Sequence, residues 1–234
     1  MKDLRPNEQR AKNALTLLWI MLGLEIISLI SSGLQYNLLS QISDFGALTP
    51  EEADANDTRE GIIGIMYLIA YIVSVVTFIM WFRRAYYNLH LRAKNLSYSD
   101  DWAAGSWFVP FMNLVRPYKI MKELYERTID LYRKNGIKLN FELNSSIVGW
   151  WWAFWIFNNI LRNITFRITN SADTVDELLT ATTFSIFNYL LGIPLALLAI
   201  RVIKDYAKAE PFLAKLQKPG EVQEKTSIEQ SVAY

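Results

Sequence analysis

The sequence predicts an all-α integral membrane protein with about four transmembrane helices and a re-entrant or interfacial helical insertion. Two observations support this fold class. Apolar residues gather in four runs of membrane-spanning length, and lysine and arginine gather in alternate connecting segments. Hydrophobic residues make up 52% of the 234 and charged residues 20%. The prediction rests on the separation of hydrophobic and charged residues into different segments, and not on their overall proportions.

The four apolar runs cover residues 14–34, 62–82, 145–161 and 181–200. Crossing a hydrocarbon core ~30 Å thick takes about 20 helical residues, with a range of roughly 17–25. All four runs fit that range, the third at its short limit. The first contains one charged residue, Glu25, and the other three contain none. Because they are apolar on every face, we expect helices in contact with lipid.

Basic residues predict the orientation. Of the 24 lysines and arginines, 21 lie before the first run, in segment 83–143, or after the fourth run. The two other loops hold only Arg59, Arg162 and Arg167. Cytoplasmic loops carry an excess of Lys and Arg, so both termini and segment 83–143 are expected in the cytoplasm. Anionic lipids of the inner leaflet are expected partners.

We expect a helical membrane domain over residues 1–205, with segment 83–143 as a cytoplasmic or interfacial insertion, and a polar tail over 206–234. Within it, residues 211–234 contain Pro219 and Gly220 and are expected to be disordered or loosely attached.

The insertion contains two distinct parts. Residues 103–115 carry no charge but are too few to span, so they form a re-entrant hairpin, an interfacial helix or a buried helix. Pro117 suits the first turn of a new helix, predicted over 117–134. Apolar and aromatic residues on one face of this helix follow one another at spacings of three and four: Tyr118, Met121, Leu124, Tyr125, Thr128 and Tyr132. That face attaches to an anionic leaflet or packs against the spans.

The stretches WFRRAYYNLH and LSYSDDWAAGSWFVPFMNLVRPYKIMKELY carry a family resemblance. The pattern comprises Trp102, Trp107, Phe108, Pro110, Phe111, Asn113, Leu114, Arg116 and Pro117. It resembles the core of a bacterial membrane family known as domain of unknown function 4328, over about residues 15–203. The resemblance implies a multi-span protein of unassigned activity in a bacterial inner membrane, and it transfers no catalytic residue.

Glu25 is the candidate ionisable site within the membrane. A charge at the centre of a span is costly, about 2.5–3.5 kcal/mol for related residues on insertion scales. It serves either as an ion or proton site or as a hydrogen-bonded group joining helices. Asn188, Tyr67, Tyr71 and Ser74 are its expected partners. Asn158, Asn159 and Arg162 are interpreted as an outer interface cap or interhelical hydrogen bonds.

Arg83, Arg84, Asn113 and Arg116 are candidate contacts for a lipid phosphate or another anion. Arg83 and Arg84 follow the aromatic end of the second run, and Asn113 and Arg116 lie between two prolines. Free N–H groups at a broken helix and an arginine suit an anion. The alternative is a proline-shaped corner whose polar side chains satisfy its backbone.

Composition narrows the function. The chain contains no cysteine and one histidine, His90. We therefore expect no catalytic, cofactor-binding or metal-binding residue, and we favour a protein that is not an enzyme. A net charge of +1 favours no nucleic-acid partner. The leading hypothesis is a non-enzymatic scaffold or regulatory membrane component, with a protein partner or as a homo-oligomer. The alternatives are a small oligomeric channel or transporter using Glu25 and the broken helix near Asn113, and a lipid-headgroup enzyme at the inner leaflet.

Overall fold

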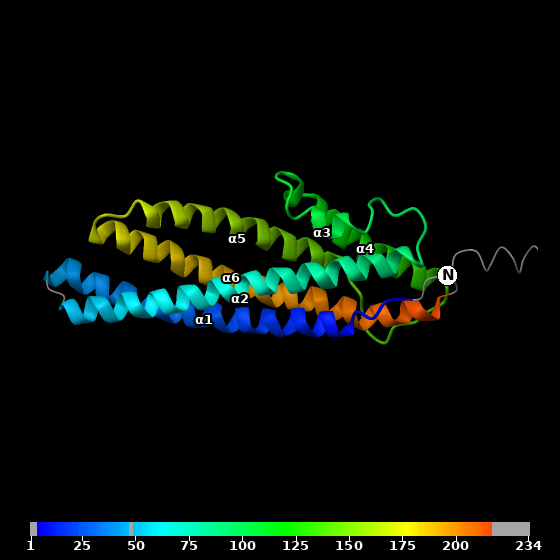
Figure 1. The fold of residues 1–234 in the computed structure, drawn as a ribbon, viewed down its shortest axis with the longest axis horizontal. Coiled ribbons are helices and arrows are strands. Elements are labelled where there is room, and N and C mark those ends of the chain that lie inside the picture. Colours follow the sequence, from blue (N-terminus) through cyan, green and yellow to red (C-terminus); the bar gives the residue numbers. More distant parts are fainter. Residues whose placement is uncertain (1–3, 47–48, 217–234) are drawn as a thin grey trace, which may run out of the picture. The chain divides into compact units, whose positions relative to one another are not determined.

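The computed structural model describes residues 4–46 and 49–216, and within these ranges every regular element is a helix (Figure 1). The all-α prediction is confirmed. In chain order the elements are α1 (Glu8–Phe45), α2 (Pro50–His90), α3 (Trp102–Gly105), η1 (Met112–Leu114), α4 (Arg116–Lys134), α5 (Ser146–Asn170), α6 (Val175–Ala209) and η2 (Glu210–Lys215).

Reciprocal hydrogen bonds explain where two of the long helices begin. Before α2, the Thr49 hydroxyl accepts the Glu52 N–H at 3.3 Å, and the Glu52 carboxylate accepts the Thr49 N–H at 3.1 Å. Thr174 and Glu177 form the same capping box at the start of α6, also at 3.3 and 3.1 Å. Each box satisfies two backbone donors that the first turn of a helix leaves without partners.

Among residues 4–46 and 49–216, three helices are long and apolar enough to cross a membrane: Glu8–Ser43, Pro50–His90 and Val175–Lys215. They contain the first, second and fourth predicted runs, so the prediction of helices with a length and composition suited to spanning is confirmed for these three. The third run forms α5, a helix of 25 residues that is not among them. Its tryptophans, two consecutive asparagines and Arg162 lower the mean hydropathy of its apolar stretch.

By its internal contacts the chain divides into two compact units. Unit 1 comprises residues 1–14, 76–149 and 201–234, and unit 2 comprises residues 15–75 and 150–200. Each of the helices α1, α2, α5 and α6 contributes residues to both units.

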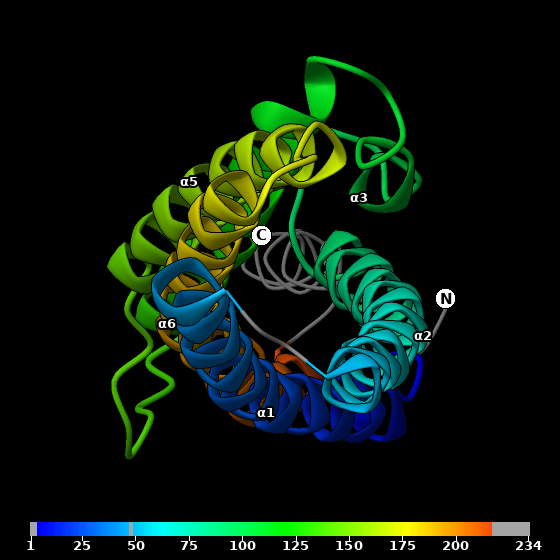
Figure 2. The same ribbon diagram turned by 90° about the vertical axis from the view of Figure 1, so that its left-hand side faces the viewer.

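Unit 2 buries several polar side chains beside apolar ones, and it exposes many large apolar side chains. Its helices follow the spatial order α2, α1, α6, α5 (Figure 2). Its buried polar side chains include Glu25, Ser28, Ser31, Ser32, Asn158, Thr165, Thr182 and Asn188. Its exposed large residues include Ile26, Ile30, Ile65, Ile69, Phe157, Ile160, Phe187 and Leu190. A surface of this kind suits lipid rather than water, and interior polar groups join helices within a membrane.

Unit 1 has an aromatic core assembled from segments far apart in the sequence. Its fully buried large side chains include Trp81, Phe82, Tyr86, Tyr125, Tyr206, Leu124, Met121 and Leu213. The Tyr125 hydroxyl donates to the Val202 carbonyl at 2.5 Å, and the Tyr132 hydroxyl donates to the Ala209 carbonyl at 2.7 Å. Burial raises the pKa of both phenols, so they remain neutral donors that fasten α4 to α6.

A buried polar network ties the N-terminal segment to this core. The Asn7 side-chain amide donates to both carboxylate oxygens of Glu210, at 3.2 and 2.9 Å. The Asn88 amide donates to Glu210 at 2.7 Å and to the Arg5 carbonyl at 2.9 Å. Glu210 therefore links α2 and η2 to residues that precede α1.

The predicted insertion at 83–143 begins later in the structure, because residues 83–90 continue α2; the rest contains α3, η1 and α4 with turns between them. Arg116–Lys134 confirms the predicted amphipathic helix, with Pro117 in its first turn. Of the predicted stripe, Met121, Leu124, Tyr125, Thr128 and Tyr132 are buried. The structure therefore favours the alternative in which this face packs against protein, and those five side chains are not available to lipid.

The first residues of the expected polar tail are helical and partly buried. The sequence predicts its start at residue 206, but α6 continues to Ala209 and η2 to Lys215. Tyr206, Ala209 and Leu213 are buried in the core of unit 1. The physical reason is that these apolar residues extend the buried face of α6 beyond the last predicted span. Residues 217–234 of the expected tail lie outside the described residues.

Candidate functional site

Glu25 lies on α1 in the interior of unit 2, with 4% of its surface exposed. Its Oε1 atom accepts a hydrogen bond from the Tyr67 hydroxyl of α2 at 2.5 Å. The same oxygen accepts one from Arg162 Nη2 of α5 at 3.1 Å, which is also a salt bridge. Tyr67 was one of the partners expected from the sequence. The carboxylate therefore joins α1 to two other helices at once.

A glycine on the fourth helix makes room for this carboxylate. A Cβ atom added at Gly192 of α6 would lie 2.4 Å from both Cδ and Oε2 of Glu25. Real Cβ atoms essentially never approach so closely, so any other residue would force a displacement. The glycine is required for close approach and not for an unusual backbone angle. Four helices of unit 2 thus converge on one carboxyl group.

Neighbouring polar side chains orient the arginine. Arg162 Nε donates to Asn158 Oδ1 at 2.9 Å, one turn earlier on α5. The Arg162 guanidinium also donates to the Tyr67 hydroxyl and lies 5.0 Å from the centre of that ring. Asn158 in turn donates to the Asn188 carbonyl of α6 at 3.5 Å, and the Asn188 amide donates to the Thr165 hydroxyl. The guanidinium is therefore held in place from several directions.

The cluster is incomplete at one atom. Within residues 4–46 and 49–216, the buried Oε2 of Glu25 has no hydrogen-bond partner. A buried carboxylate oxygen without a donor carries a substantial desolvation cost, about 1–3 kcal/mol or more. Binding a proton or a cation at this oxygen would relieve that cost. Oε2 is thus the oxygen of this carboxyl group that lacks a partner among the described residues, whereas Oε1 is paired with Arg162 and Tyr67.

A second polar group lies further along α1 and α2. The Ser31 hydroxyl donates to Glu60 Oε1 at 2.5 Å and accepts from Arg59 Nε at 2.8 Å. Arg59 Nη2 donates to Asn56 Oδ1 at 2.7 Å. Ser31 follows Glu25 by six residues, a rise of ~9 Å along a helix. The buried Ser28 lies between them on α1.

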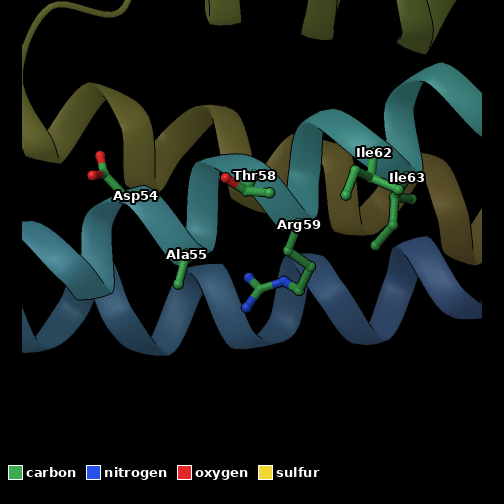
Figure 3. A pocket seen from close by; sticks show the side chains of 6 residues that line it. All are labelled: Asp54, Ala55, Thr58, Arg59, Ile62 and Ile63. Atoms are coloured by element: carbon green, nitrogen blue, oxygen red, sulfur yellow. The ribbon is translucent and has the colours of Figure 1, made fainter.

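An open hollow of about 580 Å³ adjoins this second group. It is lined by Asp54, Ala55, Thr58, Arg59, Ile62 and Ile63. Figure 3 shows that all six project from one stretch of α2, and that the Arg59 guanidinium extends towards α1. The hollow is shallow and mostly apolar, so it does not form an enclosed binding cavity.

The other predicted site residues belong to unit 1 and have different partners. Arg83 is paired with Asp101, and it lies 4.0 Å from Asp100. The Arg116 guanidinium lies over the Trp102 ring at 4.1 Å, which is a cation–π contact.

Arg84 is close enough to Arg5 and Arg10 to experience their charges. Asn113 is half-buried, and its backbone N–H donates to the Val109 carbonyl at 3.0 Å. Among the described residues, no three His, Cys, Asp or Glu side chains gather in a metal-binding group.

Two residues of the cluster are not predicted from the sequence. Arg162 follows the end of the predicted third run, so with Asn158 and Asn159 it is expected in an outer interface cap or in interhelical hydrogen bonds, and only the latter is seen, between Asn158 and Asn188 of α6. In the structure α5 continues to Asn170, which places Arg162 within the helix and opposite Glu25. Gly192 gave no signal, since a glycine in an apolar run does not reveal what lies against it.

Comparison with known proteins agrees with the resemblance seen in the sequence. A family model described as "Domain of unknown function (DUF4328)" matches residues 45–208. That range includes Tyr67, Arg162, Gly192 and the Trp102–Pro117 pattern, whereas Glu25 precedes it. No curated protein and no solved structure matches the chain significantly. Because the family match covers more than half of its length, the chain belongs to the DUF4328 family.

Proposed function

We propose that the chain is a small four-span membrane protein that transports an ion, with Glu25 as its proton- or cation-binding group. The observation that carries this proposal is the buried Glu25 carboxylate, paired with Arg162 through one oxygen and without a partner at the other among the described residues. Ionisable groups within spans are rare, and they mark proton relays and ion pathways in pumps and transporters.

The fourth span of this proposal is α5. Trp150, Phe157, Ile160, Ile164 and Phe166 of this helix are exposed large hydrophobic residues, which suit contact with lipid. Its polar residues Asn158 and Arg162 instead face partners on other helices of unit 2. A helix with an apolar outer face and an inward charge is compatible with a bilayer although its mean hydropathy is low.

The proposed orientation follows the basic residues. Both termini and segment 83–143 lie in the cytoplasm, and the connections after α1 and α5 lie outside. This places the Arg59–Glu60 group and its hollow towards the outer surface. Ser31 and the buried Ser28 lie on α1 between this group and Glu25.

The proposed chemistry is an exchange of partners at the carboxyl group. A proton bound at Glu25 Oε2 removes the negative charge and weakens the pairing with Arg162. The arginine is then left with Asn158 and the Tyr67 hydroxyl, and the contact between α1 and α5 loosens. Release of the proton restores the ion pair. This cycle links occupancy of the site to helix packing without any covalent step.

Purified protein in liposomes with an internal pH dye tests the proposal. An imposed pH gradient should collapse faster with wild-type protein than with empty liposomes, and Glu25→Gln should abolish the difference. Glu142→Gln is the matched control, because Glu142 is an exposed acid of unit 1. Equal flux from wild-type and Glu25→Gln protein would overturn the role of Glu25, and absence of wild-type flux for protons and for Na⁺ or K⁺ would overturn transport.

A non-enzymatic scaffold is the second candidate function. The observation in its favour is unit 1, where a buried aromatic core supports α4 and leaves charged side chains exposed, among them Lys119, Lys122, Glu126 and Arg127. A scaffold predicts a stoichiometric protein partner that is lost after charge reversal at Lys122 and Arg127, with flux unchanged. Transport predicts the opposite result: flux is lost after substitution of Glu25 and is kept after charge reversal on α4.

A further inference from the structure

The turn that follows α3 exposes two large aromatic side chains. Phe108 is 74% exposed and Phe111 is 85% exposed. Met112 and Val115 next to them are exposed as well. Contiguous exposed apolar side chains of this size mark a surface that contacts another apolar phase. We name residues 108–112 the aromatic turn.

The protein holds this turn in a defined position. Ala103 and Ser106, which precede it, are fully buried. The Trp107 ring contacts the Phe78 ring edge-on, with centroids 5.7 Å apart. Phe111 itself has a φ of 62°, a left-handed conformation that bulky residues rarely adopt. The backbone thus presents Phe111 outward although the protein offers its ring almost no contact.

The contact with Phe78 also indicates where the turn lies along α2. Phe78 belongs to the apolar part of α2, which ends at Trp81 and Phe82 before Arg83. Aromatic residues followed by arginine are typical of the boundary between hydrocarbon and headgroups. The aromatic turn therefore belongs to the same level as that boundary. Figure 1 shows the green segment with α3 beside the last turns of α2.

Basic side chains lie next to the turn. Arg116 follows it and is stacked on Trp102, and the exposed Lys119 lies one turn further along α4. Arg83 is held beside the same segment through Asp101. Positive charge flanking exposed aromatic rings is complementary to a membrane surface with anionic phosphates and an apolar interior.

We propose that the aromatic turn inserts Phe108 and Phe111 into the headgroup–acyl boundary of the bilayer, on the basic side of the protein. The two rings contact lipid, and this shallow insertion holds unit 1 at the membrane surface. This role is independent of ion transport at Glu25, which lies in unit 2. It also differs from a re-entrant hairpin, because only the tip of the turn enters the membrane.

The absence of cysteine from the chain permits a clean test. A nitroxide label is placed at Met112→Cys, which leaves both phenylalanines intact, in full-length protein reconstituted into phosphatidylcholine–phosphatidylglycerol vesicles. Collision rates with oxygen, which concentrates in lipid, are compared with those of a water-soluble nickel chelate. The control label is at Lys138→Cys, an exposed position of the same unit. We expect an oxygen-to-nickel ratio several-fold higher at position 112 than at position 138.

A second measurement uses the same label in the Phe108→Ser/Phe111→Ser background. Because both rings are exposed, the replacements should leave the fold intact, and the ratio at position 112 should fall to that at position 138. Equal ratios at the two positions in the parent protein would overturn the proposal. So would a high ratio that survives the double serine replacement. Dipolar broadening between labels on two copies, with low oxygen collision, would identify a second chain as the occupant instead.

Discussion

Replacing Gly192 with alanine should disrupt the Glu25 cluster by steric displacement. The added methyl group would lie 2.4 Å from Glu25 Cδ and Oε2 and 2.6 Å from Oε1, whereas ordinary van der Waals contact begins at 3.4 Å. The carboxyl group must therefore recede by about 1 Å in a close-packed interior. That movement is large enough to break the hydrogen bonds from Tyr67 and Arg162, which now measure 2.5 and 3.1 Å.

Overpacking usually costs about 1–3 kcal/mol, and the intrinsic preference of a helix for alanine over glycine offsets about 1 kcal/mol of it, so we expect Gly192→Ala to lower the free energy of unfolding by up to about 2 kcal/mol. The assay is unfolding in mixed detergent micelles followed by circular dichroism. Gly23→Ala is the matched control, because Gly23 also lies in a long helix of unit 2 but has nothing within 4 Å of an added Cβ. Its stability should hold or rise.

A double variant separates the steric mechanism from a general effect on α6. In a Glu25→Ala background the carboxyl group is gone, so Gly192→Ala should cost much less than in the parent protein. Groups in contact show such coupling, whereas distant sites add independently. A Gly192→Ala variant as stable as Gly23→Ala, or one equally destabilised with and without the Glu25 carboxylate, would refute the reasoning.

Two other predictions concern unit 1 and the orientation. Glu210→Ala removes the acceptor of the Asn7 and Asn88 amides, so the free energy of unfolding should fall by about 1.5–3 kcal/mol. The N-terminal segment should then be cleaved faster by protease, whereas the control Glu142→Ala, at an exposed position, should behave like the parent protein. Equal proteolysis rates for the two variants would contradict this prediction. In the proposed orientation, an impermeant maleimide should label Asn170→Cys in intact cells and Asn135→Cys only after permeabilisation; the reverse pattern would exclude cytoplasmic termini.

The helices were predictable because their signals are local. A long apolar run identifies a span, and a periodicity of three to four residues identified Arg116–Lys134 with its buried face. Periodicity does not say what covers a face, so lipid and protein remained alternatives for Tyr125 and Tyr132 until the contacts with α6 were seen.

The candidate site was predictable only in part. Glu25 stood out because it is the one charge in an apolar run, and Tyr67 was among its expected partners. The pairing with Arg162 joins residues 137 positions apart, and no local pattern encodes a contact at that separation. The end of α5 was set too early because Asn158, Asn159 and Arg162 resemble the end of a span. Their polarity is instead satisfied within the unit.

The most direct test of the account is whether Glu25 and Arg162 form a charge pair that joins α1 to α5 inside unit 2. Unfolding in detergent micelles is measured for Glu25→Ala, Arg162→Ala and the double variant. Arg162→Ala leaves the buried Glu25 carboxylate without its partner, which typically costs about 3–5 kcal/mol, whereas Glu25→Ala leaves Arg162, whose side chain is 34% exposed, at a smaller cost. The loss in the double variant should therefore be smaller than the sum of the two single losses by about 1–3 kcal/mol. Losses that add to within about 0.5 kcal/mol would show that the two side chains do not interact, and would contradict the proposed site.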